Sequence, residues 1–111
     1  MDKLFGDAAS HTAAEFPLRV VYNIRERRQG DEPVQVLISV SKKRFHHAVD
    51  RNRVKRQIRE AYRHQKQLLY STIPEDKALM IAFIWMTSNH VATDIIADKT
   101  KRLLTRITSK L

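Results

Sequence analysis

Two early segments of the chain alternate apolar and polar residues, which is typical of β-strands with one buried face. The first covers residues 16–25, and we expect its inward side to consist of Phe16, Leu18, Val20, Tyr22 and Ile24. The second covers residues 34–41, and its inward side consists of Val34, Val36, Ile38 and Val40. The charged segment between them, residues 26–33, contains glycine and proline. We therefore expect a hairpin loop that joins an antiparallel pair of strands.

Two later segments have the periodicity of helices packed by one side. After a connector at residues 42–50, apolar positions recur three or four residues apart, and the helix must end by Pro74. Its expected inward stripe is Val54, Ile58, Ala61, Gln65 and then Leu68 or Leu69. A loop at residues 87–93 precedes a last helix that we expect to run to the end of the chain. Its inward stripe is Ile96, Leu103, Leu104, Ile107 and Leu111.

The run ALMIAFIWM at residues 78–86 is continuously apolar, which predicts a strand buried on both faces. Trp85 lies in this run and is expected in the core. A strand, a long helix and a second strand form a crossover unit, so the sequence predicts a parallel pair within a mixed sheet. Residues 1–15 are weakly patterned, although Leu4 and Phe5 resemble the last turn of a helix that ends at Gly6.

Composition narrows the class of protein. The chain has 111 residues, of which 42% are apolar, and this length predicts one domain spanning residues 1–111. The absence of cysteine excludes disulfides, thiol catalysis and cysteine-ligated zinc. No apolar run approaches the ~20 residues that cross a bilayer, and the first residues lack the features of a secretory signal. We therefore expect a soluble, cytoplasmic domain.

The positive charge is concentrated in one segment. The formal net charge is +9, and residues 42–66 alone contribute +8. At 100° per residue the cations of the predicted helix lie opposite its apolar stripe, where like charges at helical spacing repel one another. An external polyanion would neutralise them, and we favour nucleic acid over an anionic membrane because the helix buries its apolar side in the core.

The residues that we expect to contact RNA lie on this helix and on the connector before it. Guanidinium groups bind phosphate oxygens bidentately, and an asparagine amide can donate to phosphate or ribose oxygens. Asn52 could also serve as the N-cap of the helix. The complete set is Lys42, Lys43, Arg44, Arg51, Asn52, Arg53, Lys55, Arg56, Arg59 and Arg63.

Nothing in the sequence assembles a catalytic centre. The five histidines lack the spacing and the accompanying carboxylates of a metal site. The chain has only two glycines, so a glycine-rich loop for nucleotide phosphates is not expected. We therefore predict neither protein-based catalysis nor a metal held by the protein alone, although a two-histidine ribonuclease site is not excluded by sequence.

Residues 39–63, SVSKKRFHHAVDRNRVKRQIREAYR, resemble the signature of the bacterial ribonuclease P protein subunit. The matching pieces are the SVSKK run, the Ala48–Val49 pair, the RNR tripeptide at residues 51–53, and the basic and apolar positions that follow to Arg63. A basic tripeptide alone carries little information, whereas a strand, a turn and a basic helix in this order are specific. The dense similarity covers about a quarter of the chain.

The resemblance implies an α+β fold, an α/β sandwich like the second domain of a small-subunit ribosomal protein. Helices pack a four-stranded mixed sheet, and the βαβ crossover is left-handed, against the usual right-handed preference. The protein would be a noncatalytic subunit of an endoribonuclease whose RNA, with bound Mg²⁺, cleaves precursor tRNA. Its partners would be that catalytic RNA and the 5′ leader of the precursor. The leader cleft would include Phe5, Phe16 and Arg19, although the alternation by itself places Phe16 in the core.

Two departures from the family pattern are present. Leu37 occupies a position where the family usually has glycine, and only residues 2–5 resemble the end of the family's first helix. We therefore expect that helix to be truncated and one wall of the leader cleft to be incomplete. Two other functions stay open at this point: a general or ribosomal-type RNA-binding protein of the same fold, and a small independent nuclease.

Overall fold

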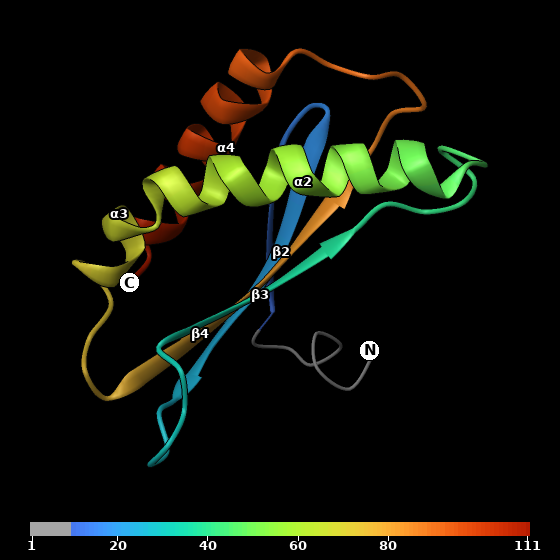
Figure 1. Ribbon diagram of the computed structural model, residues 1–111. Helices are drawn as coiled ribbons and strands as arrows, with labels where there is room; N and C mark the ends of the chain where they lie inside the picture. Colours follow the sequence, from blue (N-terminus) through green and yellow to red (C-terminus); the bar gives the residue numbers. More distant parts are fainter. Residues whose placement is uncertain (1–9) are drawn as a thin grey trace.

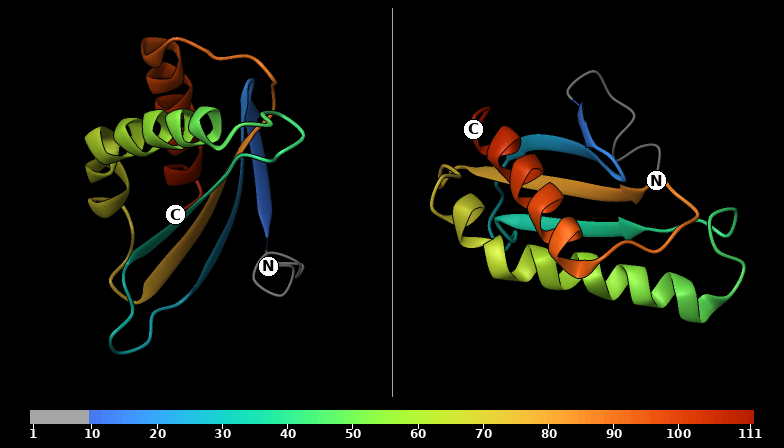
Figure 2. Two further views of the ribbon diagram at one scale, coloured as in Figure 1. Left: turned by 45° about the vertical axis from the view of Figure 1, so that its right-hand side comes forward. Right: turned by 90° about the horizontal axis from the view of Figure 1, so that it is seen from above.

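The computed structural model describes residues 10–111, which form one four-stranded mixed sheet with helices packed on one face (Figures 1 and 2). In chain order the elements are β1 (His11–Glu15), β2 (Leu18–Glu26), β3 (Val34–Ser39), α2 (Ala48–Gln65), α3 (Gln67–Tyr70), β4 (Lys77–Trp85) and α4 (Thr93–Thr108). This architecture confirms the predicted α+β class and the four-stranded mixed sheet. The handedness of the crossover stays a prediction. The predicted helix end at Leu4 and Phe5 lies outside the described residues.

The strand order is β1-β2-β4-β3, with β4 between the two strands that alternate. β4 pairs in parallel with β3, as the crossover unit predicted, and antiparallel with β2. The predicted antiparallel hairpin of residues 16–25 with residues 34–41 is therefore wrong, because both segments pair with β4 instead. Alternation shows that one face of each strand is buried, but it does not select a partner. The strand that is apolar on both faces takes the central position.

β1 was missed by the sequence analysis. Its sequence, HTAAE, has no large apolar residue and is mostly exposed, which is compatible only with an edge strand. It pairs antiparallel with β2 through a turn at Phe16 and Pro17. Phe16 is 67% exposed in this turn, so its predicted place in the core is wrong. The inward alternation begins at Leu18, where β2 begins.

The helices bury the stripes that their periodicity predicted. α2 buries Val54, Ile58 and Ala61, and Leu69 on α3 is buried whereas Leu68 is 38% exposed. α2 begins at Ala48 with His47 as its N-cap residue. The hypothesis that Asn52 caps the helix is therefore wrong, because Asn52 lies a full turn inside it. α4 ends at Thr108, three residues before the end of the chain.

One hydrophobic core lies between the helices and the sheet. β4 contributes alternate residues to it, among them Phe83, which has no exposed surface, and Trp85, which is 2% exposed as predicted. The other face of β4 is also apolar and buried, which confirms the prediction of a strand covered on both sides. Within residues 10–111, no helix combines the length and the apolar character that a membrane span requires.

Two adjacent isoleucines of α4 test the placement of the core. Ile96 is fully buried and Ile95 is 46% exposed. We expect Ile96→Ala to lower the free energy of unfolding by about 2–5 kcal/mol, through lost burial and the cavity left behind. Ile95→Ala, the matched control, should change it by less than about 1 kcal/mol. Urea denaturation measures both values, and equal losses would contradict the assigned packing of α4.

Candidate nucleic-acid interface

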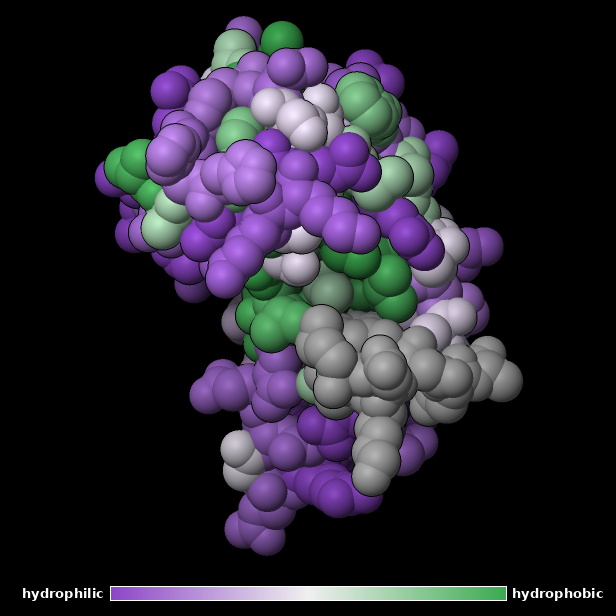
Figure 3. All heavy atoms as spheres, turned by 90° about the vertical axis from the view of Figure 1, so that its right-hand side faces the viewer, coloured by the Kyte–Doolittle hydropathy of each residue, from purple (hydrophilic) through white to green (hydrophobic). Residues whose placement is uncertain are grey.

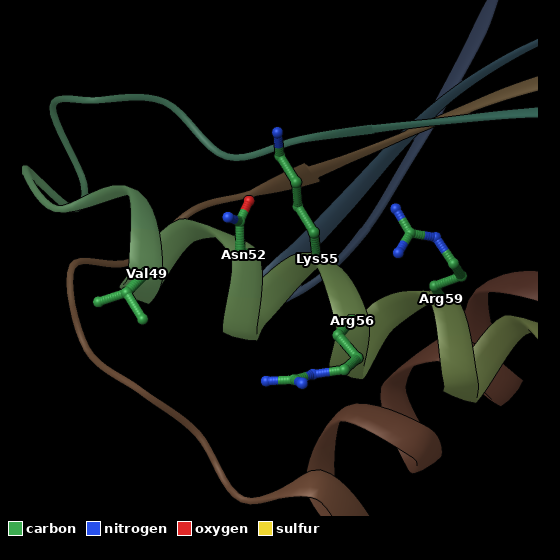
Figure 4. Close-up of a pocket in the computed structure, with 5 residues that line it drawn as sticks. All are labelled: Val49, Asn52, Lys55, Arg56 and Arg59. Atoms are coloured by element: carbon green, nitrogen blue, oxygen red, sulfur yellow. The ribbon is translucent and has the colours of Figure 1, made fainter.

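α2 contacts the core along one narrow stripe and exposes its opposite side along its length. Figure 4 shows that Asn52, Lys55 and Arg59 project from the helix toward the β3 side, whereas Arg56 projects the other way. Together with Val49 these residues line a shallow hollow on the surface of the helix. The structure thus brings together the central part of the predicted RNA-contacting set on one element.

The cations of this surface have almost no carboxylate partners among the described residues. Of the predicted RNA-contacting residues, only Arg63 forms an ion pair, at 2.9 Å from Glu60, and both side chains are well exposed. Such a pair contributes little to stability and exchanges readily for another anion. Lys42, Lys43 and Arg44 are exposed on the connector. We define the basic face as Lys42, Lys43, Arg44, Arg51, Asn52, Arg53, Lys55, Arg56, Arg59 and Arg63.

Arg51 differs from the rest of the basic face because its guanidinium already has partners. Its Nη1 donates to the carbonyl oxygens of Phe45, at 3.0 Å, and His46, at 2.9 Å. The side chain is half-buried and ties the connector to the first turn of α2. Its geometry therefore indicates a positioning role for the connector, in addition to any contact with phosphate.

A second contact of the connector involves His90 in the loop between β4 and α4. The His90 ring stacks on the buried ring of Phe45, with centroids 4.7 Å apart, and its Nε2 lies 3.1 Å from Oδ1 of Asp50. Three segments distant in sequence are thereby held together: the connector, the first turn of α2 and the loop before α4. The sequence analysis missed this cluster. Phe45, an apolar residue within a basic connector, was the available signal.

Two glutamines fix how α2 is rotated about its axis. Gln57 donates from Nε2 to the carbonyl oxygen of Val91 and to Oγ1 of Thr93, at the start of α4. Gln65 donates from Nε2 to the carbonyl oxygen of Ala97, one turn further along α4. These bonds hold one flank of α2 against α4.

The face of the sheet turned away from the helices, which we call the open face, is a second candidate surface. It is accessible at Arg19 and Leu37, whereas Ala82 at its centre is 3% exposed. Across the strands, Val21, Ala82 and Leu37 form one row on this face, and Arg19, Ile84 and Ser39 form the next. Arg19 is exposed, and the second row lies where β3 leads into the connector. Figure 3, viewed from that side, shows hydrophilic surface over the connector and the start of α2 above an apolar band.

The predicted leader-cleft residues are placed only in part. Phe16 and Arg19 lie at the same end of the sheet as the connector, because β2 begins there and β3 and β4 end there. Phe5 lies outside the described residues. Among residues 10–111, no three histidine, aspartate or glutamate side chains come together in a way that could hold a metal ion.

The sequence model of the Ribonuclease P family matches residues 2–108. The chain belongs to the ribonuclease P protein family. A ribonuclease P protein component of Porphyromonas gingivalis is 43% identical over 75 residues, which are 68% of this chain and 53% of the relative. One of Chlorobium phaeobacteroides is 55% identical over 47 residues, covering 42% of this chain and 32% of the relative. The chain thus spans about half the length of the P. gingivalis relative.

Solved ribonuclease P proteins share the fold. The Thermotoga maritima RNase P protein matches with a TM-score of 0.71 and 25% identity, over 94% of this chain and 87% of that one. The Staphylococcus aureus RNase P protein matches with a TM-score of 0.66 and 25% identity, over 88% of this chain and 81% of that one. These similarities confirm the resemblance drawn from residues 39–63 and the α+β fold with a four-stranded mixed sheet.

The His90 cluster of this ribonuclease P family protein is open to a direct test. We expect His90→Ala to loosen the connector, because it removes both the ring stacking on Phe45 and the contact with Asp50. Trypsin should then cleave after Lys42, Lys43 or Arg44 several-fold faster. His64→Ala is the matched control, because His64 is exposed and its Nε2 lies 3.6 Å from a carboxylate oxygen of Glu60, far along α2 from the connector. Equal cleavage rates in the two variants would show that His90 does not hold the connector.

Proposed function

We propose that this chain is the protein subunit of ribonuclease P, which assists the endonucleolytic 5′ maturation of tRNA. The observation that carries the proposal is the basic face, a row of cations almost without internal carboxylate partners in a chain of this family. Because the chain belongs to the ribonuclease P protein family, we assign hydrolysis of the phosphodiester to the RNA subunit and its bound Mg²⁺.

In this proposal the basic face binds the folded catalytic RNA. Arginine forks bridge adjacent phosphates, and Lys55 supplies a compact charge beside them. Asn52 is exposed on α2, so its amide is available to phosphate or ribose oxygens, including the 2′-hydroxyl. Close approach of RNA segments is limited by phosphate repulsion, and a rigid row of cations reduces that repulsion. The protein would thus favour the folded RNA and its bound Mg²⁺ without ligating the metal.

The open face of the sheet is the proposed site for the 5′ leader of precursor tRNA. Single-stranded RNA needs a cationic groove and flat apolar side chains on which bases stack, and base identity need not be read. Phe16 and Arg19 supply such groups beside the connector. Because mature tRNA lacks the leader, a leader site selects precursor over product. The reaction would take place in the cytoplasm, where precursor tRNA is transcribed.

Reconstitution tests the proposal against both alternatives. The chain plus a bacterial ribonuclease P RNA should stimulate 5′ cleavage of precursor tRNA at low Mg²⁺, and the chain alone should cleave nothing. Cleavage by nuclease-treated protein without added RNA would indicate an independent nuclease. RNA binding without stimulation would indicate a general RNA-binding protein and would contradict the proposal.

The salt dependence of RNA binding tests the basic face itself. We expect Arg53→Ala and Arg56→Ala each to lower the slope of log affinity against log salt by about 0.7–0.9, because each removes one phosphate contact. Arg102→Ala is the control, because Arg102 is exposed on α4 and pairs with Asp98 at 3.0 Å. Filter binding or fluorescence anisotropy at several salt concentrations gives the slopes. An unchanged slope for Arg53→Ala and Arg56→Ala would exclude this face as the RNA contact.

A further inference from the structure

A groove separates the β3-facing flank of α2 from the outer edge of the sheet. β3 is an edge strand, so within the described chain no further strand covers its outer side. The groove has a volume of about 320 Å³, the lower end of the range for small-molecule sites. It is lined by Val36, Leu37, Ile38, Lys55, Arg59 and Tyr62.

The floor of the groove is apolar and its aromatic group is fixed. Val36 and Ile38 face the helix side of β3 and are only partly buried, whereas Leu37 alternates to the other face of the sheet and borders the groove at the strand edge. The Tyr62 ring packs edge-on against Phe83 at 6.2 Å between centroids. Burial, together with a hydrogen bond to Tyr70, raises the pKa of Tyr62 above its usual value. The Tyr62 hydroxyl therefore stays neutral at physiological pH, and the floor carries no negative charge.

The rim of the groove is cationic. Lys55 and Arg59 lie one turn apart on α2, none of the lining residues is acidic, and neither cation forms an ion pair within residues 10–111. The same two residues also line the hollow that holds Asn52 and Arg56. Figure 4 shows Lys55 and Arg59 reaching toward the β3 side. The groove is therefore continuous with the basic face.

We propose that this groove is a subsite for one unpaired nucleotide of RNA. Its base lies on the apolar floor beside Val36 and Tyr62, and its phosphates contact Lys55 and Arg59. The inference rests on the proposed function, since it deepens the RNA contact of the basic face. It differs from the leader site because it lies at the outer edge of β3, whereas Phe16 and Arg19 lie two strands away.

The charge of the groove favours a nucleotide over a peptide that would pair with the exposed edge of β3. A peptide that added a strand to β3 would bind through its backbone and would have no need of paired cations one helical turn apart. A nucleotide combines an apolar face with an anion a few ångströms away, which matches the apolar floor and cationic rim. Binding of such a peptide is an alternative that the experiment below detects.

Fluorescence anisotropy of the full chain with three labelled probes tests the subsite. The probes are a short single-stranded oligouridylate, an abasic ribose-phosphate strand of equal length, and an RNA duplex. We expect Val36→Ser to weaken binding of the oligouridylate by about five-fold or more, as expected for loss of one base contact. The same variant should leave binding of the abasic strand and the duplex within two-fold (~0.4 kcal/mol). Lys55→Gln and Arg59→Gln should weaken binding of all three probes.

Leu68→Ser is the matched control, because Leu68 is 38% exposed on α3, away from the groove. It should leave the binding of every probe unchanged, and urea midpoints of the two serine variants confirm that both fold. Equal oligouridylate affinity for Val36→Ser and Leu68→Ser would overturn the subsite. So would binding of an acidic peptide that Val36→Ser weakens while oligouridylate binding is unaffected. Failure here leaves the reconstitution result intact, so the two proposals fail separately.

Discussion

α2 is held to the protein along a narrow apolar stripe, and the rest of the structure depends on this attachment. Val54, Ile58 and Ala61 bury one side of the helix, and polar bonds from Gln57 and Gln65 to the α4 side prevent rotation about that stripe. Most of the helix surface is consequently free to carry cations. The charges repel one another, but burial of the apolar side outweighs that repulsion in a screened, water-exposed setting. A ligand with regularly spaced phosphates can then bind cations whose positions on α2 are already fixed by the packing of the helix.

The sheet complements this helix with a different kind of surface. Its open face carries one apolar row, Val21, Ala82 and Leu37, and a mixed row nearer the connector. Its outer edge lies beside the cationic flank of α2. Folded RNA, a single-stranded leader and an unpaired nucleotide place different demands on a protein. This small α+β fold presents three surfaces: the basic face of α2, the open face of the sheet, and the groove between α2 and β3. The first two meet near the connector that Arg51 and His90 hold in place.

The sequence predicted those features that leave a periodic or compositional trace. β4 was identified by a continuous run of apolar residues. α2 was identified by its stripe of apolar residues and by the excess of positive charge on its other side. β1 was missed because HTAAE has no apolar alternation. The antiparallel pairing of residues 16–25 with residues 34–41 was wrong because alternation does not select a partner. Phe16 was misplaced because the alternation of β2 was extended past Leu18 into the turn that joins β1 to β2. The contact of His90 with Asp50 joins residues 40 positions apart, which no local pattern encodes.

Trp85 gives the molecule a built-in optical reporter. It is the single tryptophan of the chain, and it is 2% exposed at the end of β4, where it pairs across the sheet with Leu18. Indole emission depends on the polarity around the ring, so its intensity and wavelength follow the packing between sheet and helices. No residue of the basic face is aromatic, so RNA can occupy that surface while the emission continues to monitor only the integrity of the interior.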